Sequence, residues 1–163
     1  MNKKVLFICH AAMIAALYVV LTLVASSIDL ASGNVQVRFS EALTILPFFT
    51  PAAIPGLTIG CLLSNLITGC VPLDILFGTI ATLLGALGSY ALRSHQWLVP
   101  LPPILANVII VPWVLRFGYG MPLPIPFMML TVGIGEIVSC YVLGMILLFA
   151  LKKPGKALFH NPN

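Results

Sequence analysis

The stretch Val37-Arg-Phe-Ser-Glu-Ala-Leu-Thr-Ile-Leu-Pro47 places an arginine, a serine and a glutamate at the start of an otherwise apolar segment. Arg38 and Glu41 are two of only twelve formally charged residues in the chain. On a helix this spacing puts both side chains on one face, so they could pair with each other or turn inward to meet a polar ligand. Charges within a bilayer cost about 2.5 to 3.5 kcal/mol at its centre on insertion scales, so they indicate function by default. The alternative is an ion pair that anchors a helix end at the interface.

The composition around this stretch is that of an integral membrane protein. Of the 163 residues, 60% are hydrophobic and 7% are charged, whereas an average soluble domain is about 25% charged. So few charges cannot cover the surface of a soluble domain, and apolar runs recur along the whole length. The run at residues 5–26 is nearer in length to a membrane span than to a signal-peptide core, so we expect it to stay.

Prolines and turn residues divide the chain into six apolar segments, at residues 5–26, 39–54, 55–71, 72–92, 97–117 and 124–151. We therefore predict an all-α membrane protein, with six transmembrane helices in a single domain that covers residues 1–163. The second segment contains Pro47 and Pro51 and is short for a straight span of about 20 residues.

The distribution of basic residues predicts the orientation. With both termini in the cytoplasm, the inner side carries six lysines and arginines and the outer side two: Lys3, Lys4, Arg93, Lys152, Lys153 and Lys156 against Arg38 and Arg116. Because cytoplasmic loops are enriched in such residues, the count favours an N-in, C-in topology.

This topology ranks the polar residues by depth. Six polar residues are expected near the outer surface: Arg38, Ser40, Glu41, Asp74, Arg116 and Tyr119. Three are expected deeper in the membrane: Asn65, Asn107 and Glu136. Glu136 would lie up to about 18 Å below a helix start at Pro124. Polar groups that converge from several helices are typical of a small-molecule site in a bundle. The alternative is that each one makes a hydrogen bond that only packs helices together.

The first segment has a stripe of small residues in its cytoplasmic half. Ala11, Ala12, Ala15 and Ala16 form two interleaved small-xxx-small pairs, which let another helix approach closely. That helix could belong to this chain or to a partner.

Sequence motifs for catalysis, nucleotide binding and metal binding are absent. The chain has no Walker pattern, no Gly-x-Ser-x-Gly, no His-Glu-x-x-His and no carboxylate or cysteine cluster with metal spacing. Its four cysteines are scattered in apolar segments and are interpreted as small core residues. We therefore expect no enzyme activity, no catalytic residue, no metal and no bound cofactor.

Three stretches together resemble the QueT family: Val37-Arg-Phe-Ser-Glu-Ala-Leu-Thr-Ile-Leu-Pro-Phe-Phe-Thr50, Ala53-Ile-Pro-Gly-Leu-Thr-Ile-Gly-Cys-Leu-Leu-Ser-Asn65 and Pro72-Leu-Asp-Ile-Leu-Phe-Gly-Thr-Ile-Ala-Thr-Leu-Leu-Gly85. These are the substrate-binding S components of energy-coupling factor (ECF) transporters, associated with uptake of queuosine precursors. The resemblance implies a bacterial cell-membrane protein that captures its ligand outside. It would then dock on a transmembrane T subunit with two ATPases and topple to release the ligand inside. ATP would be used by those partners, and no nucleic acid would be bound. In S components an Ala-x-x-x-Ala pattern of the first helix contacts the T subunit, a place held here by Ala11, Ala12, Ala15 and Ala16.

A 7-deazaguanine base would need three kinds of contact. Its two adjacent donors suit a carboxylate fork, its carbonyl suits an amide donor, and its faces suit an aromatic ring. The candidates are Glu41 or Asp74 for the fork, Asn65 or Asn107 for the carbonyl, and Trp113, Phe39 or Tyr119 for stacking. Glu136 would partner the amine of aminomethyl-deazaguanine or queuine. Two alternatives stay open: an S component for another vitamin-like heterocycle, and a non-transporting membrane assembly protein.

Overall fold

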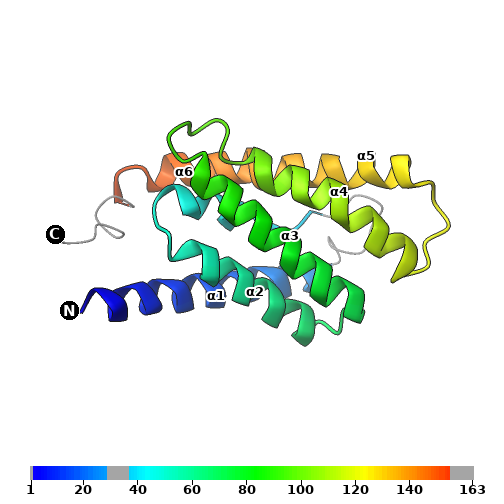
Figure 1. Cartoon of the computed structure of the whole chain (residues 1–163), viewed down its shortest axis with the longest axis horizontal. Helices are drawn as coiled ribbons and strands as arrows, with labels where there is room; N and C mark the ends of the chain where they lie inside the picture. The colour runs from blue at the N-terminus through cyan, green and yellow to red at the C-terminus, as the bar shows by residue number, and fades with distance from the viewer. Residues whose placement is uncertain (1, 29–36, 155–163) are drawn as a thin grey trace.

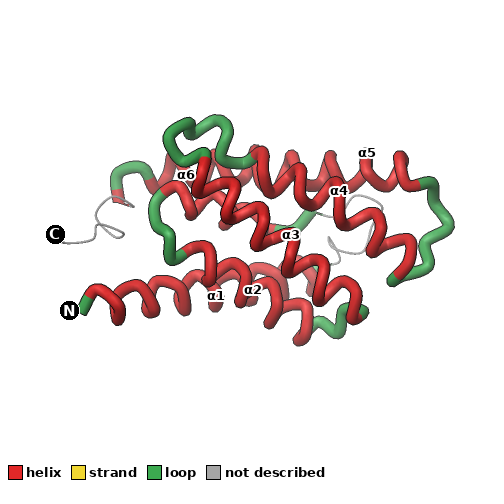
Figure 2. Tube along the Cα trace, in the orientation of Figure 1, coloured by secondary structure: helices red, strands yellow, loops and turns green. Residues whose placement is uncertain are grey.

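A computed structural model describes residues 2–28 and 37–154, and it is helical throughout that part, without a strand (Figures 1 and 2). The described residues form six helices. They are α1 (Lys3–Ser27), η1 (Phe39–Phe48), α2 (Ala53–Ile67), α3 (Pro72–Ala91), α4 (Leu101–Phe117), and a continuous last helix made of α5 (Ile125–Glu136), η2 (Ile137–Leu143) and α6 (Gly144–Leu151). The prediction of a six-helix, all-α protein is confirmed.

Three of these helices are long and apolar enough to cross a membrane: α1, α3 and the last helix. The other three, η1, α2 and α4, are apolar but shorter. The start of α1 and the end of α6 lie at the same end of the bundle (Figure 1), which is the arrangement that an even number of crossings requires. The N-in, C-in orientation itself stays a prediction.

The second segment was predicted over residues 39–54, with Pro47 and Pro51 interrupting it. In the structure it is divided: η1 is a 3₁₀ helix that ends at Phe48, and α2 begins at Ala53. Pro47 and Pro51 explain the break, because proline has no N–H to donate and disfavours α geometry in the residue before it. Most of η1 is buried, including Ser40 and Glu41, so this short helix forms the interior of the bundle.

Two other helix ends also shift. The third helix ends at Ile67, four residues before the predicted end, because the chain turns at Gly69, whose φ of +71° is accessible mainly to glycine. The fifth helix begins at Leu101, with Pro100 at its N-cap, so its start is delayed within the predicted segment 97–117, as its prolines allowed. Prolines are tolerated in a first helical turn, where N–H groups lack helical partners anyway.

The alanine stripe of α1 divides between two surfaces. Gly56 and Gly60 of α2 approach α1 so closely that a Cβ on Gly56 would lie 2.8 Å from the carbonyl oxygen of Ala11, and one on Gly60 would lie 3.1 Å from that of Ala15. Ala12 and Ala16, by contrast, are exposed. One small-xxx-small pair therefore packs inside this chain, and the other lies on its outer surface.

Candidate functional site

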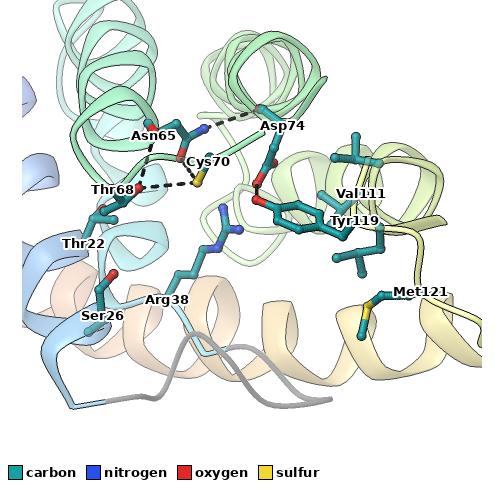
Figure 3. A pocket seen from close by; sticks show the side chains of 13 residues that line it. Thr22, Ser26, Arg38, Asn65, Thr68, Cys70, Asp74, Val111, Tyr119 and Met121 are labelled. Carbon is teal, nitrogen blue, oxygen red and sulfur yellow. Dashed lines mark hydrogen bonds between the residues drawn. The ribbon is translucent and has the colours of Figure 1, made fainter. Parts of the chain in front are cut away.

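A cavity of about 350 Å³ opens at the end of the bundle opposite the start of α1. Pockets that bind small molecules usually have a volume of at least about 300 Å³. Residues from α1, α2, α3, α4 and the connecting segments line it. The polar ones are Thr22, Ser26, Arg38, Asn65, Thr68, Cys70, Asp74 and Tyr119, and the others are Ala25, Val111, Val114, Leu115 and Met121 (Figure 3). We call this space the polar cavity.

Asp74 and Tyr119 form one wall of the polar cavity. Asp74 lies in the first turn of α3, where the helix dipole favours a negative charge. The Tyr119 hydroxyl donates a hydrogen bond of 2.9 Å to Asp74 Oδ2. Desolvation, and then the charge of Asp74, raise the pKa of Tyr119 well above its usual value. The phenol therefore stays protonated as a donor, and it holds the carboxylate in place.

Asn65 faces Asp74 across the tight turn between α2 and α3. Its Nδ2 is 3.5 Å from the Asp74 carbonyl oxygen and 3.6 Å from Cys61 Sγ. The backbone N–H of Cys70 donates to the Asn65 carbonyl oxygen at 3.0 Å and closes the turn. Asn65 was predicted to lie deeper than Asp74, and this is wrong: because α2 ends at Ile67, Asn65 is in its last turn and at the level of Asp74.

Arg38 enters the polar cavity from the opposite side. Its side chain points into the space between Asn65 and Asp74 (Figure 3). Its backbone N–H donates to Ser139 Oγ at 3.2 Å, which attaches the start of η1 to the last helix. The cavity thus combines one guanidinium, one carboxylate and one carboxamide with several apolar side chains, a set that suits a flat polar heterocycle better than an apolar ligand.

A second polar group lies outside the lining of the polar cavity. Tyr18 OH donates to Glu41 Oε1 at 2.5 Å, and Cys140 Sγ donates to Glu136 Oε2 at 3.1 Å. All four residues are at most 7% exposed. We call Tyr18, Glu41, Glu136 and Cys140 the buried cluster. Glu41 was expected near the outer surface with Arg38, but it lies beside the deep residue Glu136, because each 3₁₀ residue rises about 2 Å.

The remaining candidates have various environments. Asn107 of α4 is buried beside the carboxylate of Glu136. Ser40 is fully buried, and its Oγ has no hydrogen-bond partner within the described residues. Arg116, at the end of α4, is exposed and donates to the carbonyl oxygen of Met121 at 3.1 Å. None of these three lines the polar cavity.

The aromatic candidates are also separated. Trp113 is 48% exposed and stacks on Phe117, with ring centroids 6.1 Å apart. Both rings line a different, apolar groove, while Phe39 lines neither space. Of the three rings considered for stacking, Tyr119 is the one that borders the polar cavity.

Several residues that line the polar cavity were not predicted from the sequence. Thr22 and Ser26 stand four residues apart on α1, and Thr68 and Cys70 occupy the turn after α2. The four-residue spacing of Thr22 and Ser26 places both hydroxyls on one face of an apolar helix, and this pattern could have indicated a polar surface there. The cysteines are only in part the predicted core residues: Cys61 and Cys140 are buried, but Cys9 is exposed and Cys70 is partly exposed.

Comparison with known proteins gives an independent result. The family model described as QueT transporter matches residues 8–153. The chain is also similar to the queuosine precursor transporter QueT of Lactococcus lactis subsp. cremoris (strain MG1363), with 36% identity over 82 residues, which are 50% of this chain and 48% of that protein. The match thus spans about half the length of this curated relative. No solved structure matches.

Proposed function

The chain belongs to the QueT transporter family, and from this premise we propose that it is the S component of an ECF-type importer for a queuosine precursor. In this role it binds queuine or a related 7-deazaguanine base from outside and delivers it inward. The observation that carries the proposal is the polar cavity, where Asp74, Asn65 and Arg38 converge at one end of the bundle.

The chemistry of the cavity walls supports a deazaguanine base. Asp74 supplies acceptors for the two adjacent donors of its pairing edge. Arg38 or Asn65 supplies a donor for the carbonyl, and Tyr119 supplies a ring at the rim. The earlier assignment of Glu136 to a ligand amine gains no support, because Glu136 does not line the cavity. Glu41 does not line the cavity either, whereas Asp74 does, so the two adjacent ligand donors are assigned to Asp74.

The energy for transport is assigned to partner subunits. ATP would be hydrolysed by two ATPases held by a transmembrane T subunit, and this chain would bind no cofactor. The exposed pair Ala12 and Ala16 on α1 is the proposed contact with the T subunit, because small side chains let a neighbouring helix approach closely. Ala11 and Ala15 are already occupied by α2.

The ligand is tested by calorimetry on the purified, detergent-solubilised protein. Queuine and aminomethyl-deazaguanine are titrated separately, with guanine as the competitor. Tight, saturable binding of either compound that guanine does not abolish is the expected result. A folded protein that binds neither would contradict the assignment, and a panel of other vitamin-like heterocycles would then be screened by thermal stability.

The partner surface is tested by copurification with coexpressed T subunit and ATPases. Ala16→Leu adds bulk to the exposed pair and should reduce recovery of the complex. Val24→Leu is the matched control, because Val24 is 45% exposed on the same helix but lies outside the pair. Equal loss of the complex in both variants, or in neither, would count against the Ala12 and Ala16 surface.

A further inference from the structure

The buried cluster places three potential metal ligands together in the interior. One oxygen of Glu41, one oxygen of Glu136 and the sulfur of Cys140 lie within 4.8 Å of one another. These residues are 2%, 7% and 0% exposed, respectively. Glu41 belongs to η1, and the other two residues belong to successive turns of the last helix. Because 94 residues lie between Glu41 and Glu136 in the sequence, no local motif indicates this cluster. The expectation that the chain binds no metal rested on sequence motifs, which cannot show a cluster of this kind.

Hydrogen bonds satisfy this cluster only in part. Glu41 Oε1 accepts from Tyr18, and Glu136 Oε2 accepts from Cys140. Glu41 Oε2, however, is buried without a hydrogen-bond partner in the described part of the chain. A carboxylate oxygen without a partner in a low-dielectric interior is costly, and two neighbouring carboxylates repel each other. Arg38 acts electrostatically on Glu41, but its side chain points into the polar cavity (Figure 3). Glu41 Oε2 thus accepts no hydrogen bond from the described residues, so an acceptor oxygen remains available inside the buried cluster.

We propose that Glu41, Glu136 and Cys140 bind a divalent cation of the zinc type. One thiolate and two carboxylates match the donors that Zn²⁺ accepts, and three protein ligands leave a fourth position for water. Tetrahedral zinc ligands lie about 3.5 Å apart, as follows from the usual metal–ligand bond lengths. Rotations of the three side chains would close the remaining distance. On binding, the Cys140 thiol loses its proton to solvent and the sulfur takes the metal.

The neighbouring residues support this assignment. Tyr18 donates to Glu41 Oε1 and so orients the carboxylate, which is the usual role of an outer hydrogen-bond partner at a metal site. Glu136 and Cys140 are four residues apart, so their side chains project from successive turns on one face. A bound ion would join η1 to the last helix one residue away from Ser139, to which Arg38 is attached.

The test uses the full chain, purified in detergent, stripped with a chelator and titrated with Co²⁺ as a spectroscopic substitute for Zn²⁺. Tetrahedral cobalt with a thiolate ligand gives a sulfur-to-metal charge-transfer band. We expect this band to saturate at one equivalent, and Zn²⁺ to abolish it by displacing cobalt. Zn²⁺ should also raise the unfolding temperature of the wild type, but not that of Glu136→Gln.

Cysteine variants identify the ligand. Cys140→Ser should lose the charge-transfer band, whereas Cys70→Ser, which changes a partly exposed thiol near the polar cavity, should retain it. Survival of the band in Cys140→Ser would overturn the proposal. So would a wild-type protein that binds neither metal stoichiometrically, a result that does not depend on whether any variant folds. Because no queuosine precursor is present, either outcome is independent of the transport function.

Discussion

Removing the charge of Asp74 with little change in its shape, by Asp74→Asn, is expected to weaken deazaguanine binding about 100-fold. In the proposed complex the carboxylate accepts two hydrogen bonds from the ligand. The carboxamide keeps one acceptor and presents its NH₂ group to the second ligand donor. Hydrogen bonds to charged groups contribute about 1.5 to 3 kcal/mol. We take about 3 kcal/mol for the loss, and since 1.4 kcal/mol is about tenfold, the dissociation constant rises about two powers of ten.

Glu41→Gln is the matched control for this prediction. It makes the same chemical change at a residue that is 2% exposed and does not line the polar cavity. Calorimetry with the preferred ligand on wild type and both variants is the assay, with gel filtration to establish that each variant is folded. The reasoning fails if Asp74→Asn binds as tightly as wild type, or if Glu41→Gln weakens binding as much as Asp74→Asn does.

Three further predictions concern stability and pH. Gly60→Ala should lower the unfolding free energy by about 1 to 3 kcal/mol by overpacking, because its new Cβ would lie 2.7 Å from Tyr18 Cβ. The control Gly133→Ala, whose nearest contact is at 3.4 Å, should have little effect, and equal unfolding temperatures of the two variants would contradict the prediction. Tyr18→Phe leaves Glu41 without its donor and should cost about 1 to 3 kcal/mol, measured by denaturation in detergent; an unchanged stability would exclude this hydrogen bond. Because its folded-state pKa is raised, Tyr119 contributes stability that is complete below the unfolded value of about 10 and is lost as pH rises through the folded value. Ultraviolet titration should show its ionisation moving to lower pH in Asp74→Asn, and no movement would remove Asp74 as a cause.

The part of the polar cavity that the sequence predicted consists of polar residues at the ends of apolar segments. Arg38, Asp74 and Tyr119 stand beside helix ends, so errors of a few residues in the helix boundaries hardly change their position. Asn65 was predicted as a candidate site residue and does line the cavity, but it was placed at the wrong depth, because its depth depends on where α2 ends. Sequence patterns give helix ends less reliably than they give the presence of a helix.

The residues that sequence reasoning missed or misplaced depend on details that no local pattern shows. Thr22 donates to the Tyr18 carbonyl oxygen at 2.9 Å, as hydroxyl side chains in apolar helices often do, so it resembles ordinary filler until the packing is known. Trp113 faces the apolar groove and not the polar cavity, because side-chain direction depends on the rotation of α4 in the bundle. The alanine stripe was recognised, but only the close approach of α2 separates Ala11 and Ala15 from the exposed pair.

The polar cavity and the buried cluster are connected through η1. A 3₁₀ helix has three residues per turn, so positions three apart lie directly in line along its axis. The Glu41 N–H donates to the Arg38 carbonyl oxygen at 3.1 Å, and Thr44 Oγ1 donates to the Glu41 carbonyl oxygen at 2.6 Å. Arg38 borders the polar cavity, Glu41 belongs to the buried cluster, and Thr44 lies beside Cys140. An α-helix would rotate these side chains away from a common line and shorten the step between them. The short, proline-interrupted helix therefore explains how one segment carries a charge that faces the polar cavity and, about 6 Å farther in, an acidic group that faces the last helix.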